Sequence, residues 1–231
     1  MKEIAKFIKE GLKITAKTKV NEKPKYNYHP KTNKELQDLL TILIKVRGND
    51  GDFNDIDVSK ITDMKKLFVN YSNFNGDISN WDVSNVETMR SMFLKSKFNG
   101  DISNWDVSNV KNMEYMFNGS EFNGDISNWN VSNVENMQGM FCRSKFTGDI
   151  SKWDVSEVTT MANMFWYAEF NNDISNWDVS NVKTMFNMFC KSKFNGDISK
   201  WKVGEDTDLE SMFEDTLLEK NPPKWYKNKY N

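Results

Sequence analysis

Apolar side chains recur along most of this chain with a period of 24 residues. One copy of the repeat reads FNGDISNWDVSNVKNMEYMFNGSE, in which Trp105 follows Phe98 by seven positions. Six full repeats with this spacing begin at Phe74, Phe98, Phe122, Phe146, Phe170 and Phe194. Such a period is typical of repeat arrays, because a unit this short can enclose a core only together with its neighbours.

Two shorter spacings alternate inside each repeat. Ile102, Trp105 and Val107 are spaced by three and two residues. This spacing predicts a short strand that points these side chains inward and Asp106 outward. Apolar residues over 110–117 predict a short α- or 3₁₀-helix. We therefore expect a leucine-rich-repeat-like solenoid whose 24-residue coils each contain a short strand and a short helix, with an all-β solenoid as the alternative.

The residues just before the array predict an α-helix. Thr32 and Glu35 are placed as a capping box, and Gly48 is placed as a stop, so we expect an N-terminal capping helix over 34–48. Such a helix would cover the first coil, whose core would otherwise face water. Its predicted apolar stripe consists of Leu36, Leu39, Leu40, Leu43 and Val46.

The rest of the chain divides into three further segments. Residues 49–217 form the expected solenoid of one degenerate and six full repeats. Residues 218–231 keep Trp225 in phase but are otherwise polar, which predicts a half-coil that caps the C-terminal end. Residues 1–33 are rich in lysine and contain Pro24 and Pro30, so we interpret them as a basic tail or arm.

Charge is divided unevenly between the tail and the array. Residues 1–33 hold nine lysines and three glutamates, a net charge of +6, so a total of -2 leaves -8 for the remaining residues. A nucleic-acid partner requires a basic face on the ordered body. The acidic array therefore argues against nucleic-acid binding.

Export and redox signals point to a reducing location. The chain has no run of 18 apolar residues and no uninterrupted apolar segment near its start, so we expect neither a membrane span nor a signal peptide. Cys142 and Cys190 lie two repeats apart, about 10 Å at roughly 4.8 Å per coil, which is too far for a disulfide. We expect free thiols, and an intracellular or virion-associated location is favoured over secretion, although the location stays open.

Aspartates recur at fixed places and raise the question of a metal. Asp77, Asp101, Asp125, Asp149, Asp173 and Asp197 form one column of the array. Stacked like charges suggest a calcium ladder, but the Gly-rich calcium-binding nonapeptide pattern is missing and neighbouring Ser and Asn offer ordinary hydrogen bonds. His29 is the only histidine. We therefore expect no metal, no cofactor and no catalytic residues.

The motif FNGDISNWDVSNVxxMxxMF resembles the Trp and Met-Phe repeats of the BspA-like bacterial surface protein family, which occur also in mycoplasma surface lipoproteins. The resemblance covers residues 52–225 and implies a leucine-rich-repeat-like solenoid with a role in protein or cell-surface binding. It carries no catalytic residues. The Lys-rich opening also looks like leaders of small phage-encoded proteins.

Positions that the repeat does not fix are the candidates for partner contact. Tyr115, Trp166, Tyr167 and Phe186 stand where other repeats place small or charged residues. Trp and Tyr that a scaffold does not demand are typical interface anchors. The alternative is that Leu94, Cys142, Trp166 and Cys190 form a half-buried column between coils.

The function that these features favour is binding without catalysis. We expect a non-enzymatic protein-binding repeat module with an extended interaction surface, possible as a phage-encoded virion component or host-factor inhibitor. The first alternative is an adhesin-type structural protein of a bacterial surface. The second is a glycan-binding protein that uses exposed Trp and Asp rows. The sequence does not identify the protein partner.

Overall fold

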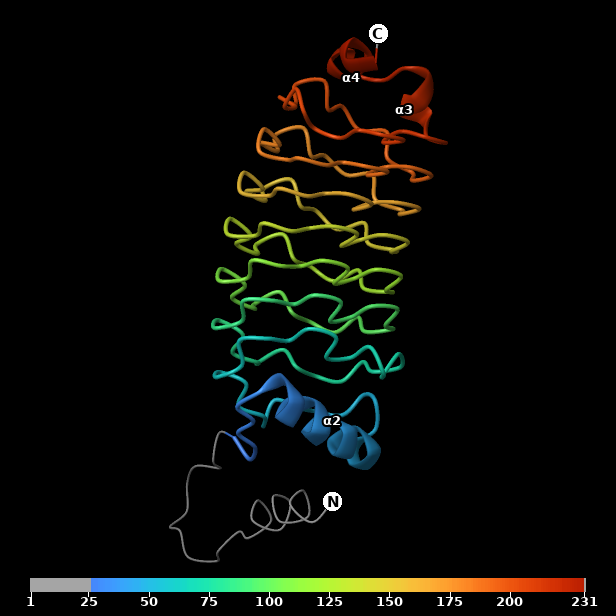
Figure 1. Ribbon diagram of the computed structural model, residues 1–231. Helices are drawn as coiled ribbons and strands as arrows, with labels where there is room; N and C mark the ends of the chain where they lie inside the picture. The colour runs from blue at the N-terminus through green and yellow to red at the C-terminus, as the bar shows by residue number, and fades with distance from the viewer. Residues whose placement is uncertain (1–25, 231) are drawn as a thin grey trace, which may run out of the picture.

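The computed structural model describes residues 26–230 and shows a long stack of coils (Figure 1). Helix α2 (Asn33–Arg47) lies across the N-terminal end of the stack. The short helices α3 (Leu217–Lys220) and α4 (Lys224–Tyr230) lie at the C-terminal end. None of the helices in this part of the chain is both long and apolar enough to cross a membrane.

Single parallel bridges join each coil to the next. Asn112 pairs with Thr88 on one side and with Asn136 on the other, and the same pairing continues at intervals of 24 residues. The bridged residues of this series are Asp63, Thr88, Asn112, Asn136, Thr160, Thr184 and Asp208. Residues one repeat apart in sequence are therefore direct neighbours in space.

The strand expected around Trp105 does not form, although its side chains point as predicted. Ile102, Trp105 and Val107 are buried and Asp106 is exposed. The backbone makes two turns instead, in which Trp105 N–H donates to the Ile102 carbonyl (3.2 Å) and Val110 N–H donates to the Val107 carbonyl (2.9 Å). The strand prediction is wrong because the apolar spacing determines which side chains face the core and leaves the backbone hydrogen bonds open.

The short helix expected over 110–117 does not form either. Tyr115 has a φ of 55°, in the left-handed region that interrupts a right-handed helix. The N–H groups of Met113 and Tyr115 donate to Asn136 and Gln138 of the next coil (2.9 and 2.8 Å). The helix prediction is wrong because these amides bond between coils. The same positive φ recurs at Ser91, Gly139, Asn163, Asn187 and Ser211.

The ends of this hydrogen-bond series have their own polar partners. Because each coil donates these N–H groups to the following coil, the first carbonyls of the series have no preceding donor. The side-chain amide of Asn33 donates to the carbonyls of Asp63 (2.8 Å) and Lys65 (3.2 Å). At the other end, the Glu219 carboxylate accepts from Asp215 N–H (3.1 Å). Helices α2 and α3 thus supply hydrogen bonds as well as cover.

Aromatic rings fill the core in continuous columns. The Phe117 ring lies 5.6 Å from Phe93 and 5.8 Å from Phe141, its equivalents one repeat away. It also lies 4.4 Å from Phe122, which belongs to the second Phe column. All four rings are buried. Each coil therefore supplies half of its neighbour's core, as a repeat without a core of its own requires.

A third column consists of tryptophans and continues into the C-terminal cap. The indole N–H of Trp105 donates to the Ile78 carbonyl of the preceding coil (3.2 Å). In α4, Trp225 stacks on Trp201 at 6.4 Å and donates to the Ile198 carbonyl in the same manner (2.9 Å). The half-coil predicted for 218–231 is therefore built from α3 and α4, with Trp225 in the place of the next Trp.

Helix α2 forms where the capping signals predict it. The Thr32 hydroxyl accepts from Glu35 N–H (3.2 Å), the Glu35 carboxylate accepts from Lys31 N–H (2.7 Å), and the chain leaves the helix at Gly48 with a φ of 80°. The predicted stripe is wrong at one residue. Val46 is 77% exposed, and Ile44, one turn after Leu40, takes the inward place.

Part of the predicted tail is docked on the first coil. Residues 1–25 of the expected basic arm lie outside the described residues. Tyr28 forms a parallel bridge with Ile56, and His29 Nδ1 lies 3.1 Å from Asp57 Oδ2. Residues 26–30 thus lie against the degenerate coil, next to α2.

Candidate functional site

The repeat places three unusual side chains next to one another. Arg143, Tyr167 and Lys191 occupy the same position in consecutive coils, and each has a φ of 55° or 56°. Arg143 N–H donates to the Trp166 carbonyl (2.7 Å), and Tyr167 N–H donates to the Cys190 carbonyl (3.0 Å). These bonds fix the three backbones side by side, so their side chains project from one edge of the stack.

The side chains at this edge form an aromatic and cationic cluster. The guanidinium carbon of Arg143 lies 4.6 Å from the Trp166 ring centre and 5.4 Å from the Tyr167 ring centre. Lys191 Nζ lies 5.5 Å from the Tyr167 ring centre. The two rings meet edge to face at 5.0 Å. We call Arg143, Trp166, Tyr167 and Lys191 the Arg143 cluster.

Burial separates the two aromatic residues. Tyr167 is 46% exposed, whereas Trp166 is half-buried between Cys142 and Cys190 in its column. Both cysteines are free and buried, and burial raises the pKa of Cys142 to about 11. Cys142 and Cys190 are therefore not surface residues. The half-buried column is correct for Trp166, and the exposed interpretation is correct for Tyr167.

Tyr115 has a structural partner and lies apart from the cluster. Its hydroxyl accepts from the Gln138 side-chain amide (2.7 Å). Its ring lies across Gly139, where an added Cβ would meet Tyr115 ring carbons at 2.3 Å. Gly139 also has a φ of 59°, so both the ring and the backbone require glycine there. Tyr115 is therefore half-buried by a specific contact.

Phe186 does not join the other three candidates. It is half-buried, and its carbonyl accepts from Asn163 N–H (2.8 Å). Within residues 26–230, no ring contact links Phe186 with Tyr115, Trp166 or Tyr167. The structure thus brings together Trp166 and Tyr167, and it adds Arg143 and Lys191. The signal for these two cations was their position 24 residues before and after Tyr167.

The Asp columns are satisfied by local hydrogen bonds. Asp101 Oδ1 accepts from Ser103 N–H (2.9 Å), and this backbone bond is the main cause of its lowered pKa. The neighbouring charges of Asp77 and Asp125 act in the opposite direction and are outweighed. Within residues 26–230, no group of three or more His, Cys, Asp or Glu is arranged to hold a metal ion. The columns therefore have a structural explanation.

Replacing Asp106 with asparagine is expected to change the free energy of unfolding at pH 7 by under about 0.5 kcal/mol, whereas alanine is expected to cost about 1 kcal/mol. Asp106 Oδ1 accepts from Ser108 N–H (3.0 Å), and Asn130 makes the same bond to Ser132 in the next repeat (3.2 Å). Urea denaturation of the two variants measures the difference. Equal losses would show that the charge, not the acceptor oxygen, is what the fold needs.

The same experiment has a pH dependence with a fixed sign. Hydrogen bonds from Ser108 lower the pKa of Asp106 below its value in the unfolded chain. Its contribution to stability is therefore present above the unfolded pKa, about 4, and is lost as the pH falls through the folded pKa. The wild type should lose more stability than Asp106→Asn between pH 5 and pH 2.

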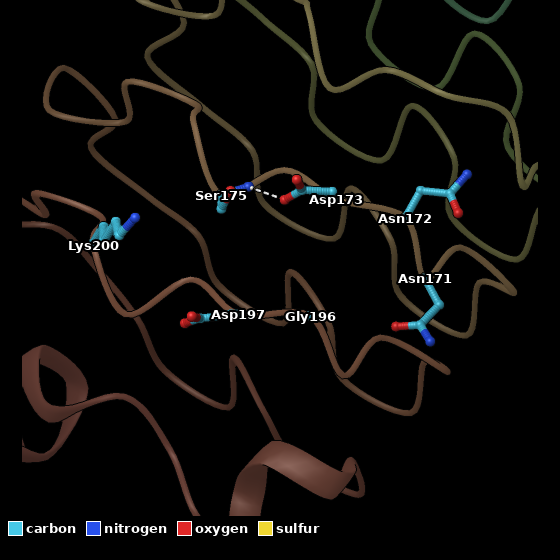
Figure 2. A pocket seen from close by; sticks show the side chains of 7 residues that line it. All are labelled: Asn171, Asn172, Asp173, Ser175, Gly196, Asp197 and Lys200. Atoms are coloured by element: carbon cyan, nitrogen blue, oxygen red, sulfur yellow. Dashed lines mark hydrogen bonds between the residues drawn. The ribbon is translucent and has the colours of Figure 1, made fainter.

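A polar cavity of about 410 Å³ opens between the last two full repeats (Figure 2). Asn172 stands there in a column where the other full repeats have glycine, and its amide donates to the carbonyls of Thr147 (2.6 Å) and Gly148 (3.1 Å). Figure 2 shows Asp173 turned toward Ser175, whose N–H it accepts at 2.8 Å. The lining residues are Asn171, Asn172, Asp173, Ser175, Gly196, Asp197 and Lys200. The lining contains no aromatic side chain on which a sugar ring could stack.

Comparison with known proteins identifies a family. The family model described as "Mycoplasma protein of unknown function, DUF285" matches the chain twice, over residues 37–145 and 118–225. No curated protein and no solved structure matches the chain. The two matches together span residues 37–225 and include all six full repeats. They agree with the mycoplasma part of the resemblance and leave the BspA-like assignment as a hypothesis. The chain thus belongs to the family of Mycoplasma proteins of unknown function, DUF285.

Proposed function

We propose that this chain is a non-enzymatic protein-binding repeat module and that the Arg143 cluster is its contact surface. The observation that carries the proposal is the exposed Tyr167 ring beside Trp166, at positions where other repeats have Lys, Gly, Asp, Asn or Leu. Tyr, Trp and Arg are the residues most enriched at the energetic centres of protein interfaces. A scaffold that does not need these side chains has another use for them.

The proposed setting is a bacterial surface, with the array as a leucine-rich-repeat-like solenoid. The 24-residue parallel bridges and the two capped ends support a solenoid, since stacked repeats need exactly such neighbour contacts and end covers. The family description names Mycoplasma, which supports the BspA-like and adhesin-type hypotheses over a phage-encoded virion component or host-factor inhibitor. The glycan-binding alternative has less support, because the polar cavity lacks an aromatic side chain.

Alanine at both Trp166 and Tyr167 is expected to reduce recovery of the partner at least tenfold while leaving the fold intact. Tagged wild-type and variant proteins would be incubated with extract from the native cells and their hosts, and recovered proteins quantified by mass spectrometry. Lys95→Ala is the matched control, since Lys95 is exposed in the same column as Tyr167 and has the same positive φ.

Thermal melts followed by circular dichroism would accompany the capture. Tyr167→Ala alone removes a side chain that is nearly half exposed, so we expect its melting temperature to change little. Recovery of the same proteins in the same amounts by wild type and double variant would contradict the proposed contact surface.

A further inference from the structure

The three arginines of the chain differ in their partners. Arg47 donates to both carboxylate oxygens of Asp55 (2.6 and 2.9 Å), and Arg90 Nε lies 2.9 Å from a carboxylate oxygen of Glu114. Within residues 26–230, no carboxylate lies at ion-pair distance from Arg143. Arg143 is also exposed, so its guanidinium is accessible from solvent.

The lysines around Arg143 do have carboxylate partners. Lys145 lies 3.7 Å from Glu121, and Lys191 lies 3.7 Å from Asp215. These pairs cancel most of the local field, so the positive charge without a compensating partner at this edge is that of Arg143. A ligand that matches this edge would bring one negative charge to one place.

The aromatic rings hold Arg143 ready for such a ligand. Its guanidinium lies over the Trp166 and Tyr167 rings, at 4.6 and 5.4 Å from their centres, which restricts the side chain before any partner arrives. Ring contacts use the faces of the planar group and leave its N–H edge free. That edge has the spacing that accepts the two oxygens of a carboxylate. A residue ordered in advance loses less entropy on binding.

We propose that Arg143 binds a carboxylate of an acidic segment in the protein partner, and that Trp166 and Tyr167 pack against an apolar residue beside that carboxylate. This inference rests on the proposed protein-binding function and specifies the chemistry of the partner. The rings give the contact its apolar area and the guanidinium gives it charge and direction. A basic or purely apolar segment lacks the group that fits the free N–H edge.

Three blocked decapeptides test the proposal with the full chain. Each has a central Phe flanked by four Glu, four Gln or four Lys, and binding is followed by isothermal titration calorimetry at two salt concentrations. We expect the Glu peptide to bind, the Gln peptide to bind at least tenfold more weakly, and the Lys peptide not to bind. Higher salt should weaken the Glu peptide, because an exposed ion pair is screened.

Two variants assign the binding to Arg143. Arg143→Gln and Arg143→Lys should each weaken the Glu peptide by about tenfold or more, since a lysine cannot bind both oxygens in one plane. Arg90→Gln is the matched control and should bind as the wild type does. Equal binding of the Glu peptide by Arg143→Gln and wild type would overturn the proposal.

The partner capture separates this inference from the function beneath it. If Arg143→Gln recovers the partner normally while the Trp166 and Tyr167 double variant does not, protein binding stands and the carboxylate inference fails. If neither variant changes recovery, the proposed contact surface fails as well. Loss with both variants supports both.

Discussion

Replacing Phe141 with alanine is expected to lower the free energy of unfolding by about 3–5 kcal/mol, the cost of removing a fully buried aromatic ring. The Phe141 ring is 0% exposed and lies between Phe117 and Phe165, each at 5.8 Å. It also contacts Phe146 at 4.4 Å and Trp153 at 6.2 Å. The cavity would therefore remove contacts from three coils at once.

Phe141→Leu is the matched control for this experiment. Leucine keeps most of the apolar volume and should cost clearly less than alanine, about 1–2 kcal/mol. Urea denaturation followed by circular dichroism gives both values. A loss below about 1 kcal/mol for Phe141→Ala would show that the coils do not share a continuous core.

Deleting residues 98–109, half a repeat, is expected to unfold the chain, whereas deleting residues 98–121, one whole repeat, is expected to leave a folded and shorter stack. After the whole deletion, Thr88 would pair with Asn136 in place of Asn112, and the aromatic columns would close in phase. After the half deletion, apolar positions of later coils would meet polar positions of earlier ones.

Circular dichroism and a thermal melt would distinguish the two deletions. The whole deletion brings Lys97 next to Lys145 on an exposed edge, so a cost of a few tenths of a kcal/mol is expected from like charges, beyond the loss of one coil. An unfolded whole-repeat deletion, or a half-repeat deletion that melts like the wild type, would contradict the repeat architecture.

The sequence predicts the core of a repeat far better than its backbone. The 24-residue period identifies Trp105 and Val107 as inward residues, and both are buried. It does not reveal that Tyr115 has a positive φ, because glycine marks that column only at Gly139 and the other residues give no signal. Apolar spacing reports burial, while the turns and the bonds between coils depend on backbone conformation. For this reason the strand and helix predictions failed while the inward positions were right.

The candidate site shows the same division. Trp166 and Tyr167 can be found from the sequence because they depart from their columns. Arg143 and Lys191 cannot be singled out by residue type, since arginine and lysine are ordinary on a surface. Their position in the Tyr167 column becomes informative only once the structure shows adjacent left-handed residues with ring contacts of 4.6–5.5 Å. Tyr115, which departs from its column in the same way, instead packs on Gly139.

Site-specific photo-crosslinking tests the proposed contact surface most directly. A benzophenone side chain would replace Tyr167 in one protein and Asn128, an exposed residue of the 126–129 turn, in another. After irradiation in native cells with their host, we expect a discrete protein adduct from position 167 that position 128 does not give. An adduct of equal yield from both positions, or from position 128 alone, would contradict a partner surface at the Arg143 cluster.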